Sequence, residues 1–238
     1  MLSRVLGLLP WLLVALAASA GEPLRLAGLA VEDRPTRAVV EHPTLVRALA
    51  PVRFASTLQT TEWLLDHPPL AAALARHLHP PLERYHLQAL GSGRYDVNDQ
   101  GALRGTLRLV AAAPARRVYL CEGRFRSLAH ILTLNGTMVF TLEYRQLRDG
   151  SQPLMEVTPA LYLRLDNVLA HGLVKVLGPL LHGVIDRRVA SLTAATLIVG
   201  ERITRDAAGL YREMAAWPDL QPGDLEAFRT AFLGDHTS

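Results

Sequence analysis

Cysteine is almost absent from this chain, which has one cysteine, Cys121, in 238 residues. An intramolecular disulfide is therefore impossible, and the folded state must depend on packing. Cys121 lies in the segment VYLCEGRF, whose alternation is typical of a strand. We expect it to be a small buried side chain and not a reactive thiol.

Lysine is equally scarce, because Lys175 is the only lysine among 25 basic residues. The arginines are spread among 22 acidic residues and form no run of five, and aromatic residues make up only 6% of the chain. A nucleic-acid-binding protein is expected to show a basic stripe or a platform of aromatic side chains. We therefore predict no nucleic-acid partner.

Motifs for catalysis, cofactors and metals are missing as well. The chain has no P-loop and no G-x-S-x-G, and Gly91-Ser92-Gly93 is a lone G-x-G with no helix start after it. Residues 96–101 alternate oxygen-bearing side chains as a calcium loop does, but the distal glutamate is missing, so a hairpin turn is favoured. His77 and His79 have chelating spacing without a third ligand. We predict no cofactor and no metal, and we assign no catalytic residue.

Long apolar runs are confined to the N-terminus. Residues 1–4 carry one positive charge, residues 5–17 are apolar, and Ala18-Ser19-Ala20 supplies small residues for signal peptidase. The run is shorter than the roughly 20 residues of a membrane span, and Pro10 interrupts it. We predict a cleaved signal peptide and an exported protein, either periplasmic or secreted.

The body of the chain opens with a mixed lead-in over residues 21–50, in which only residues 45–50 have a helical pattern. Residues 51–58 alternate as a strand, and two short helices follow, the second one after Asp66 as its N-cap and ending before Pro80-Pro81. From Arg84 onward the period changes to two residues, with turns at Gly91-Ser92-Gly93 and Asp149-Gly150. Consecutive strands at this spacing predict an antiparallel sheet with one apolar and one polar face.

A long helix is predicted from residue 166 to residue 214, after a cap at Asp166-Asn167. Gly178-Pro179 removes a backbone donor, so we expect a kink or a break there. An apolar stripe at helical spacing would cover the apolar face of the sheet; it consists of Leu169, Leu173, Leu177, Leu180, Val184, Leu192, Val199 and Ile203.

This order of elements resembles the START-like helix-grip superfamily, the polyketide cyclase/dehydrase and lipid-transport (SRPBCC) group. The resemblance rests on STLQTTEWLLDHPPLAAAL, RGTLRLV, RRVYLCEGRF, MVFTLEYRQL, LYLRLDN and the long helix, about two thirds of the chain. It implies an α+β fold in which a curved antiparallel sheet packs on a long C-terminal helix. It also implies a cavity between them for lipids, sterols, polyketides or other apolar molecules. An export signal, the lead-in and the tail helix depart from the group.

The predicted organisation is a signal peptide (1–20), a lead-in (21–50), a helix-grip domain (51–216) and a tail with a short helix (217–238). The predicted partner is a hydrophobic small molecule or lipid, with peripheral membrane contact as a further option. Candidate binding residues are strand aromatics and methionines together with two histidines of the long helix; they are Tyr95, Tyr119, Phe125, Met138, Phe140, Tyr144, Met155, His171 and His182.

Two other functions stay open at this stage. His171, Lys175, His182 and Asp186 fall within a narrow arc of a continuous helix, either as a proton-transfer or anion-holding strip in the pocket or as a solvent face. A small-molecule enzyme of the cyclase or hydrolase type would use tyrosines and histidines of the pocket. An envelope-associated interaction module would instead expose an apolar patch at Phe228 and Phe232. A non-catalytic binding protein is the favoured interpretation.

Overall fold

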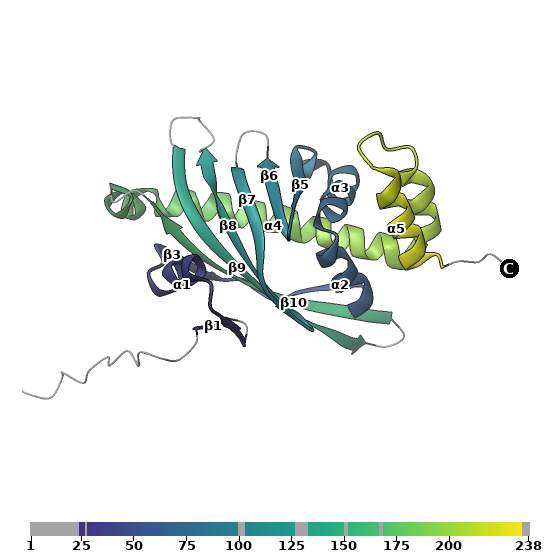
Figure 1. The fold of residues 1–238 in the computed structure, drawn as a ribbon, viewed down its shortest axis with the longest axis horizontal. Helices are drawn as coiled ribbons and strands as arrows, with labels where there is room; N and C mark the ends of the chain where they lie inside the picture. Colours follow the sequence, from purple (N-terminus) through teal and green to yellow (C-terminus); the bar gives the residue numbers. More distant parts are fainter. Residues whose placement is uncertain are drawn as a thin grey trace, which may run out of the picture.

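The computed structural model describes residues 24–26, 28–99, 103–126, 133–149, 152–166 and 169–234. Within these ranges, the side chains of residues 24, 25, 125, 149 and 169–189 are not described. The fold is α+β, with a curved antiparallel sheet and a long C-terminal helix (Figure 1). The predicted order of a strand, two short helices, antiparallel strands and a long helix is confirmed.

The main sheet has eight strands in the order β3-β10-β9-β8-β7-β6-β5, with β4 also paired to β10. Neighbours from β5 to β10 follow one another along the chain. The turn between β5 and β6 contains Gly91 and Gly93, whose φ angles of 85° and 66° suit glycine. The strands are β3 (Leu45–Ala48), β4 (Val52–Ala55), β5 (Tyr85–Gly91), β6 (Arg94–Asp99), β7 (Leu103–Ala113), β8 (Arg116–Arg126), β9 (Thr133–Asp149) and β10 (Gln152–Leu165).

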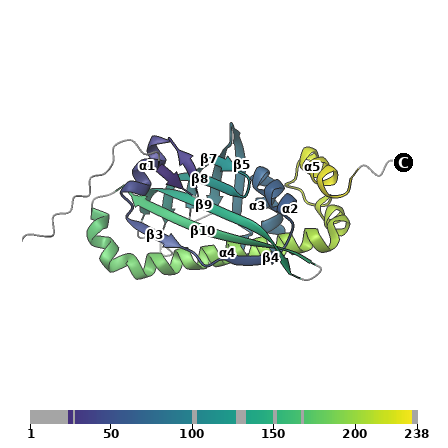
Figure 2. The same cartoon turned by 90° about the horizontal axis from the view of Figure 1, so that it is seen from below.

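The helix α4 (Leu169–Met214) runs along the length of the sheet, as the two views in Figures 1 and 2 show. It continues through Gly178 and Pro179, so the expected break there is wrong. The non-helical backbone lies instead at Asp206 (φ −156°, ψ 67°), whose carboxylate accepts a hydrogen bond from the Gly209 N–H at 2.8 Å. Asp206 therefore acts as an N-cap for a new helical segment, which is why α4 changes direction near its end.

The concave face of the sheet is closed by helices at one end. Phe54 of β4, Tyr144 and Met155 form a core with Leu197 of α4 and with residues of α2 (Leu58–Asp66). Close contact between β4 and α4 requires Gly200, because a Cβ there would lie 3.0 Å from the Phe54 ring. A second cluster joins Leu87 and Val97 to α3 (Pro68–Leu78).

The outer face of the sheet is not uniformly polar, contrary to the prediction from alternation. Val118, Leu120 and Val139 are buried under the lead-in, which forms a hairpin of β1 (Leu24–Leu26) and β2 (Leu29–Val31) and the helix α1 (Arg34–Glu41). The physical reason is that VYLC in β8 is apolar on both faces, as a strand covered on both sides requires. The expected helix at residues 45–50 is also wrong, because residues 45–48 form β3 and pair with β10.

The C-terminal helix α5 (Pro222–Phe232) belongs to a helical core at the end of the molecule. Phe228 is fully buried against α3 and α4, and Trp63 packs edge-on against it at 6.1 Å between ring centroids. The exposed patch at Phe228 that an interaction module requires is therefore not present. A 3-10 turn, η1 (Pro80–Leu82), completes this end. Leu192 of the predicted apolar stripe is 38% exposed, whereas Val199 and Ile203 are buried as expected.

Candidate functional site

Six of the predicted site residues have side chains on the concave face, because antiparallel register places directly opposed residues on the same face. Tyr119 lies opposite Phe140, Phe140 opposite Leu161, and Tyr95 opposite Leu107. The six residues are Tyr95, Tyr119, Met138, Phe140, Tyr144 and Met155. Phe125 lies on the same face by register, but its side chain is outside the description, as are those of His171 and His182.

These residues occupy two different environments. Met155 and Tyr144 are 0% and 3% exposed and belong to the packed end under α2, so they close the face. The middle of the face is covered less completely and is only half-buried. We call this region the central apolar patch; it consists of Leu107, Leu109, Met138, Phe140 and Leu163.

Tyr119 and Cys121 of β8 lie between residues of the central apolar patch but are buried, each 5% exposed. Burial raises the pKa of the Tyr119 phenol well above its usual range and raises the pKa of the Cys121 thiol to about 11. The phenol is therefore neutral and the thiol protonated at neutral pH. The Tyr119 hydroxyl makes no hydrogen bond with another described residue, although a buried tyrosine hydroxyl usually has a partner.

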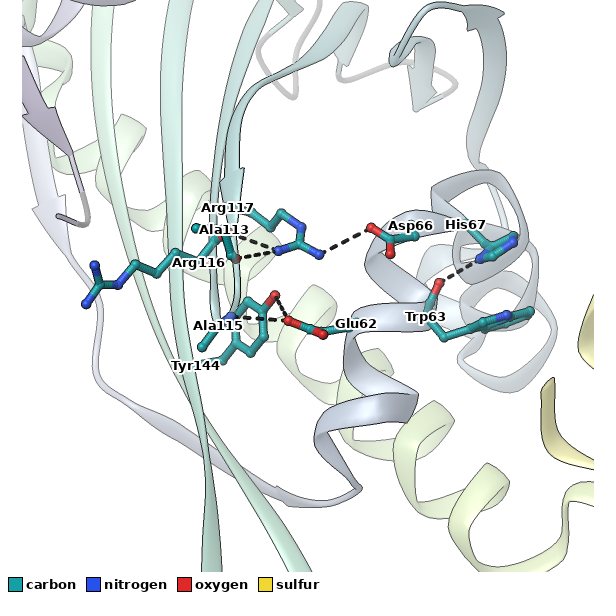
Figure 3. Close-up of polar contacts among 9 residues, drawn as sticks. All are labelled: Glu62, Trp63, Asp66, His67, Ala113, Ala115, Arg116, Arg117 and Tyr144. Atoms are coloured by element: carbon teal, nitrogen blue, oxygen red, sulfur yellow. Dashed lines mark hydrogen bonds and ion pairs between the residues drawn. The ribbon is translucent and has the colours of Figure 1, made fainter. Parts of the chain in front are cut away.

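A polar cluster closes the packed end and ties α2 to the sheet (Figure 3). The Glu62 carboxylate accepts hydrogen bonds from the Tyr144 hydroxyl and from the Ala115 N–H, both at 3.2 Å. Ala115 has a left-handed φ of 64° in the turn between β7 and β8, so Glu62 also holds this turn. Burial, opposed by the nearby Arg117 charge, raises the pKa of Tyr144 to about 12, so this phenol is a donor at neutral pH.

Arg117 is the second link of the polar cluster and is 6% exposed. Its guanidinium donates to the carbonyl oxygens of Ala113 (2.8 Å) and Arg116 (3.0 Å) and forms an ion pair with Asp66 at 3.3 Å. It also lies 5.9 Å from the centre of the Tyr144 ring. A buried guanidinium needs such partners, since an uncompensated buried charge is costly.

The sequence did not identify this cluster. The pattern predicts Asp66 as the N-cap of the second short helix, but His67 holds that position and Asp66 ends α2 beside Arg117. Glu62 lies in the middle of α2, which is capped by Thr57. Both carboxylates lie more than fifty residues from their partners along the chain, so no local signal points to these pairs.

Other candidate sites show no ligand geometry. His77 bonds to Asp219 at 2.8 Å through Nε2 and stacks on Trp217, so its ring is used by the fold. Among the described residues no three His, Cys, Asp or Glu side chains are grouped to hold a metal ion. A groove of about 250 Å³ lies on the outer face beside α1, but its Arg164 guanidinium is engaged by the Ala38 carbonyl oxygen.

In the described part of the chain, no helix is both long enough and apolar enough to span a membrane. The predicted signal peptide at residues 1–20 lies outside the described residues.

Comparison with known proteins identifies similar layouts but no family. No protein-family model and no curated protein matches the sequence. A conserved protein from Geobacillus kaustophilus aligns with a TM-score of 0.47 and 11% identity over 66% of this chain and 93% of its own. The aromatase/cyclase Zhui from Streptomyces sp. R1128 aligns with a TM-score of 0.38 and 16% identity, over 69% of this chain and 99% of its own. A truncated norcoclaurine synthase from Thalictrum flavum aligns with a TM-score of 0.36 and 14% identity, over 64% of this chain and 94% of its own.

Each of these TM-scores is below 0.5, so no ligand or activity is transferred from those proteins to this chain. Membership of the START-like superfamily stays a prediction, while the helix-grip arrangement itself is present in the structure.

Proposed function

We propose that this protein is a non-catalytic carrier or binder of a hydrophobic or amphipathic small molecule, lipid-like in character, held between the concave sheet face and α4. The observation that supports it is the central apolar patch, where Met138 and Phe140 are half-buried although they lie in the middle of the sheet. A packed core would bury such side chains fully, at roughly 1.5–3 kcal/mol for each large apolar side chain. A bound apolar molecule would supply that burial.

The ends of the face favour a defined position for such a ligand. The core around Phe54 and Met155 closes one end, and the cluster around Leu87 and Val97 closes the side next to α3. Tyr119, between Leu109 and Phe140, offers one neutral hydroxyl inside an otherwise apolar surface. This combination suits a mostly apolar molecule with a single polar group.

The groups on this face favour binding over catalysis. Cys121 is protonated at neutral pH and is therefore a poor nucleophile. Tyr144 is a neutral donor engaged by Glu62, whose carboxylate also holds a turn. A cyclase-like or hydrolase-like enzyme would depend on His171 or His182, and it would be revealed by turnover that His182→Ala abolishes.

Export is part of the same proposal. A signal peptide at residues 1–20 would place the binder in the periplasm or outside the cell, and sequencing the N-terminus of the mature protein would show cleavage before Gly21.

A fluorescent apolar probe tests the binding site. N-phenyl-1-naphthylamine should bind the mature protein, and Phe140→Asp should weaken binding by at least about tenfold because a charge enters the apolar patch. Val46→Asp, at an apolar residue that is 50% exposed on β3, is the matched control and should bind normally. Equal binding by both variants, with both folded by circular dichroism, would place the probe elsewhere and refute the site.

A further inference from the structure

Two groups of arginines on the outer face of the sheet differ in their partners. Those near the lead-in and β4 are neutralised, since Arg53 and Arg145 both bind Glu156 and Arg108 binds Asp33. The second group lies toward the other end of β7 and β8 and is exposed. It makes no ion pair with the described part of the chain; we call it the arginine crest, and it consists of Arg104, Arg124 and Arg126.

The register of the strands sets the positive charges of the arginine crest side by side. Arg104 lies directly opposite Arg124, and Arg126 follows two residues later on the same face. The next residues across the sheet are the uncharged Asn98 and Asn135. Like charges directly opposite on neighbouring strands lie about 5 Å apart and destabilise a sheet. Arg104 donates a hydrogen bond to the Asn98 side-chain oxygen at 3.3 Å. The carboxylates of Glu122 and Asp96 lie in the next row on the same face, and within the described chain neither forms an ion pair with the arginine crest.

Glycines on the inner face shape the sheet at this position. Gly105 lies opposite Gly123, and Gly123 lies opposite Gly136. A Cβ at Gly105 would meet the Glu122 carbonyl oxygen at 2.2 Å, and a Cβ at Gly123 would meet the Arg104 carbonyl oxygen at 2.7 Å. Glycines at such positions allow a sheet to bend tightly toward the face without side chains. The strands curve along their length (Figure 1). By register the arginine crest lies on the face opposite Tyr119, which is the convex side of the sheet.

We infer that the arginine crest is a docking surface for an anionic phospholipid bilayer. Three exposed guanidinium groups without an ion pair, on a convex surface, match the many phosphates of a lipid surface better than one small anion. Base stacking has no platform here, because the outer-face Tyr162 packs into the core under the lead-in. The inference goes beyond the proposed function and does not depend on it, although a carrier of apolar molecules would need to meet a membrane.

Vesicle binding tests this inference. The full chain should bind vesicles of equimolar phosphatidylcholine and phosphatidylglycerol and leave pure phosphatidylcholine vesicles unbound. The double variant R104Q/R124Q should lower the partition coefficient roughly thirtyfold, since each arginine near an anionic surface contributes about fivefold. The charge-conserving variant R104K/R124K should restore most of the binding.

The matched control is R205Q/R212Q, which makes the same charge change at exposed positions of α4. It should lower the partition coefficient by no more than about threefold. An equal loss in both double variants, or no binding of the wild-type chain to the anionic vesicles, would overturn the inference. Preference for duplex DNA over the anionic vesicles would overturn it as well.

Probe binding separates this inference from the proposed function. R104Q/R124Q should bind N-phenyl-1-naphthylamine as the wild-type chain does, because the arginine crest and the central apolar patch lie on opposite faces. A chain that binds vesicles and no apolar probe would retain the docking surface and lose the carrier proposal.

Discussion

At the scale of single residues, Tyr119 is the most informative side chain of the candidate site. It is 95% removed from solvent, it is neutral, and its hydroxyl has no partner within the described chain. A neutral phenol in this position can donate a hydrogen bond to a ligand oxygen. We therefore expect the polar group of the ligand to be an acceptor such as a carbonyl or ester oxygen.

Tyr119→Phe should lower affinity for a ketone-bearing apolar probe such as prodan by about two- to tenfold, since one hydrogen bond contributes about 0.5–1.5 kcal/mol. Affinity for 2-dimethylaminonaphthalene, which lacks the ketone, should stay the same. Fluorescence titration measures both. The control Tyr162→Phe lies on the outer face and should change neither affinity. A similar loss for both probes in Tyr119→Phe would indicate altered packing and contradict the role in recognition.

At the scale of elements, the tail is fastened to α3 by Asp219. Burial acts to raise the pKa of this carboxyl, but hydrogen bonds from His77 and Arg76 outweigh it and lower the pKa to about 2. A carboxylate whose pKa is lowered on folding stabilises the protein above its unfolded pKa, and that contribution disappears as the pH falls through the folded value. The relevant window is therefore from about pH 4 down to about pH 2.

Asp219→Asn should cost about 1 kcal/mol of unfolding free energy at neutral pH, a value reduced from the full linkage because the side chain is 35% exposed. The difference from the wild-type chain should shrink between pH 4 and pH 2, as followed by urea denaturation at each pH. Asp96→Asn, at an exposed position of β6, is the control. If the difference in unfolding free energy between Asp219→Asn and the wild-type chain stays constant down to pH 2, the ionised Asp219 carboxylate is not the source of the stability.

The glycines of β7, β8 and β9 belong to the same scale, because they set the curvature of the sheet. Gly123→Ala should destabilise the protein by about 2 kcal/mol or more, since the added Cβ would lie 2.7 Å from a backbone oxygen that cannot easily move. Gly223→Ala, where nothing lies within 4 Å, should be neutral or slightly stabilising. Thermal unfolding compares the two variants, and equal melting temperatures would show that the sheet accommodates the methyl group.

At the scale of the whole molecule, the fold was predictable where hydrophobic periodicity is unambiguous. The strands after Arg84, the two short helices and α4 follow from the change of period and from turn residues. The lead-in was not predictable, because its residues 45–48 are too short a segment to distinguish a strand from a helix. The apolar character of both faces of β8 was visible in VYLC, but what covers the second face depends on contacts with α1 far along the chain.

The candidate site was predictable only in part, for the same reason. Alternation places Tyr95, Tyr119, Met138 and Phe140 on one face, and the register confirms it. Alternation does not say which of these side chains are packed and which are half-buried, so Met155 and Tyr144 were grouped with the rest. The Glu62 and Arg117 contacts depend on how α2 docks over the sheet, and no spacing in the sequence encodes that.

The carrier proposal is tested most directly by native mass spectrometry of the mature protein, followed by solvent extraction of whatever has co-purified. A carrier should show a mass above that of the chain alone, lost on denaturation, together with an apolar small molecule in the extract. Phe140→Asp should carry markedly less of it. Repeated preparations that contain the chain alone, with no exchangeable apolar molecule and no uptake from added lipid, would contradict the central claim.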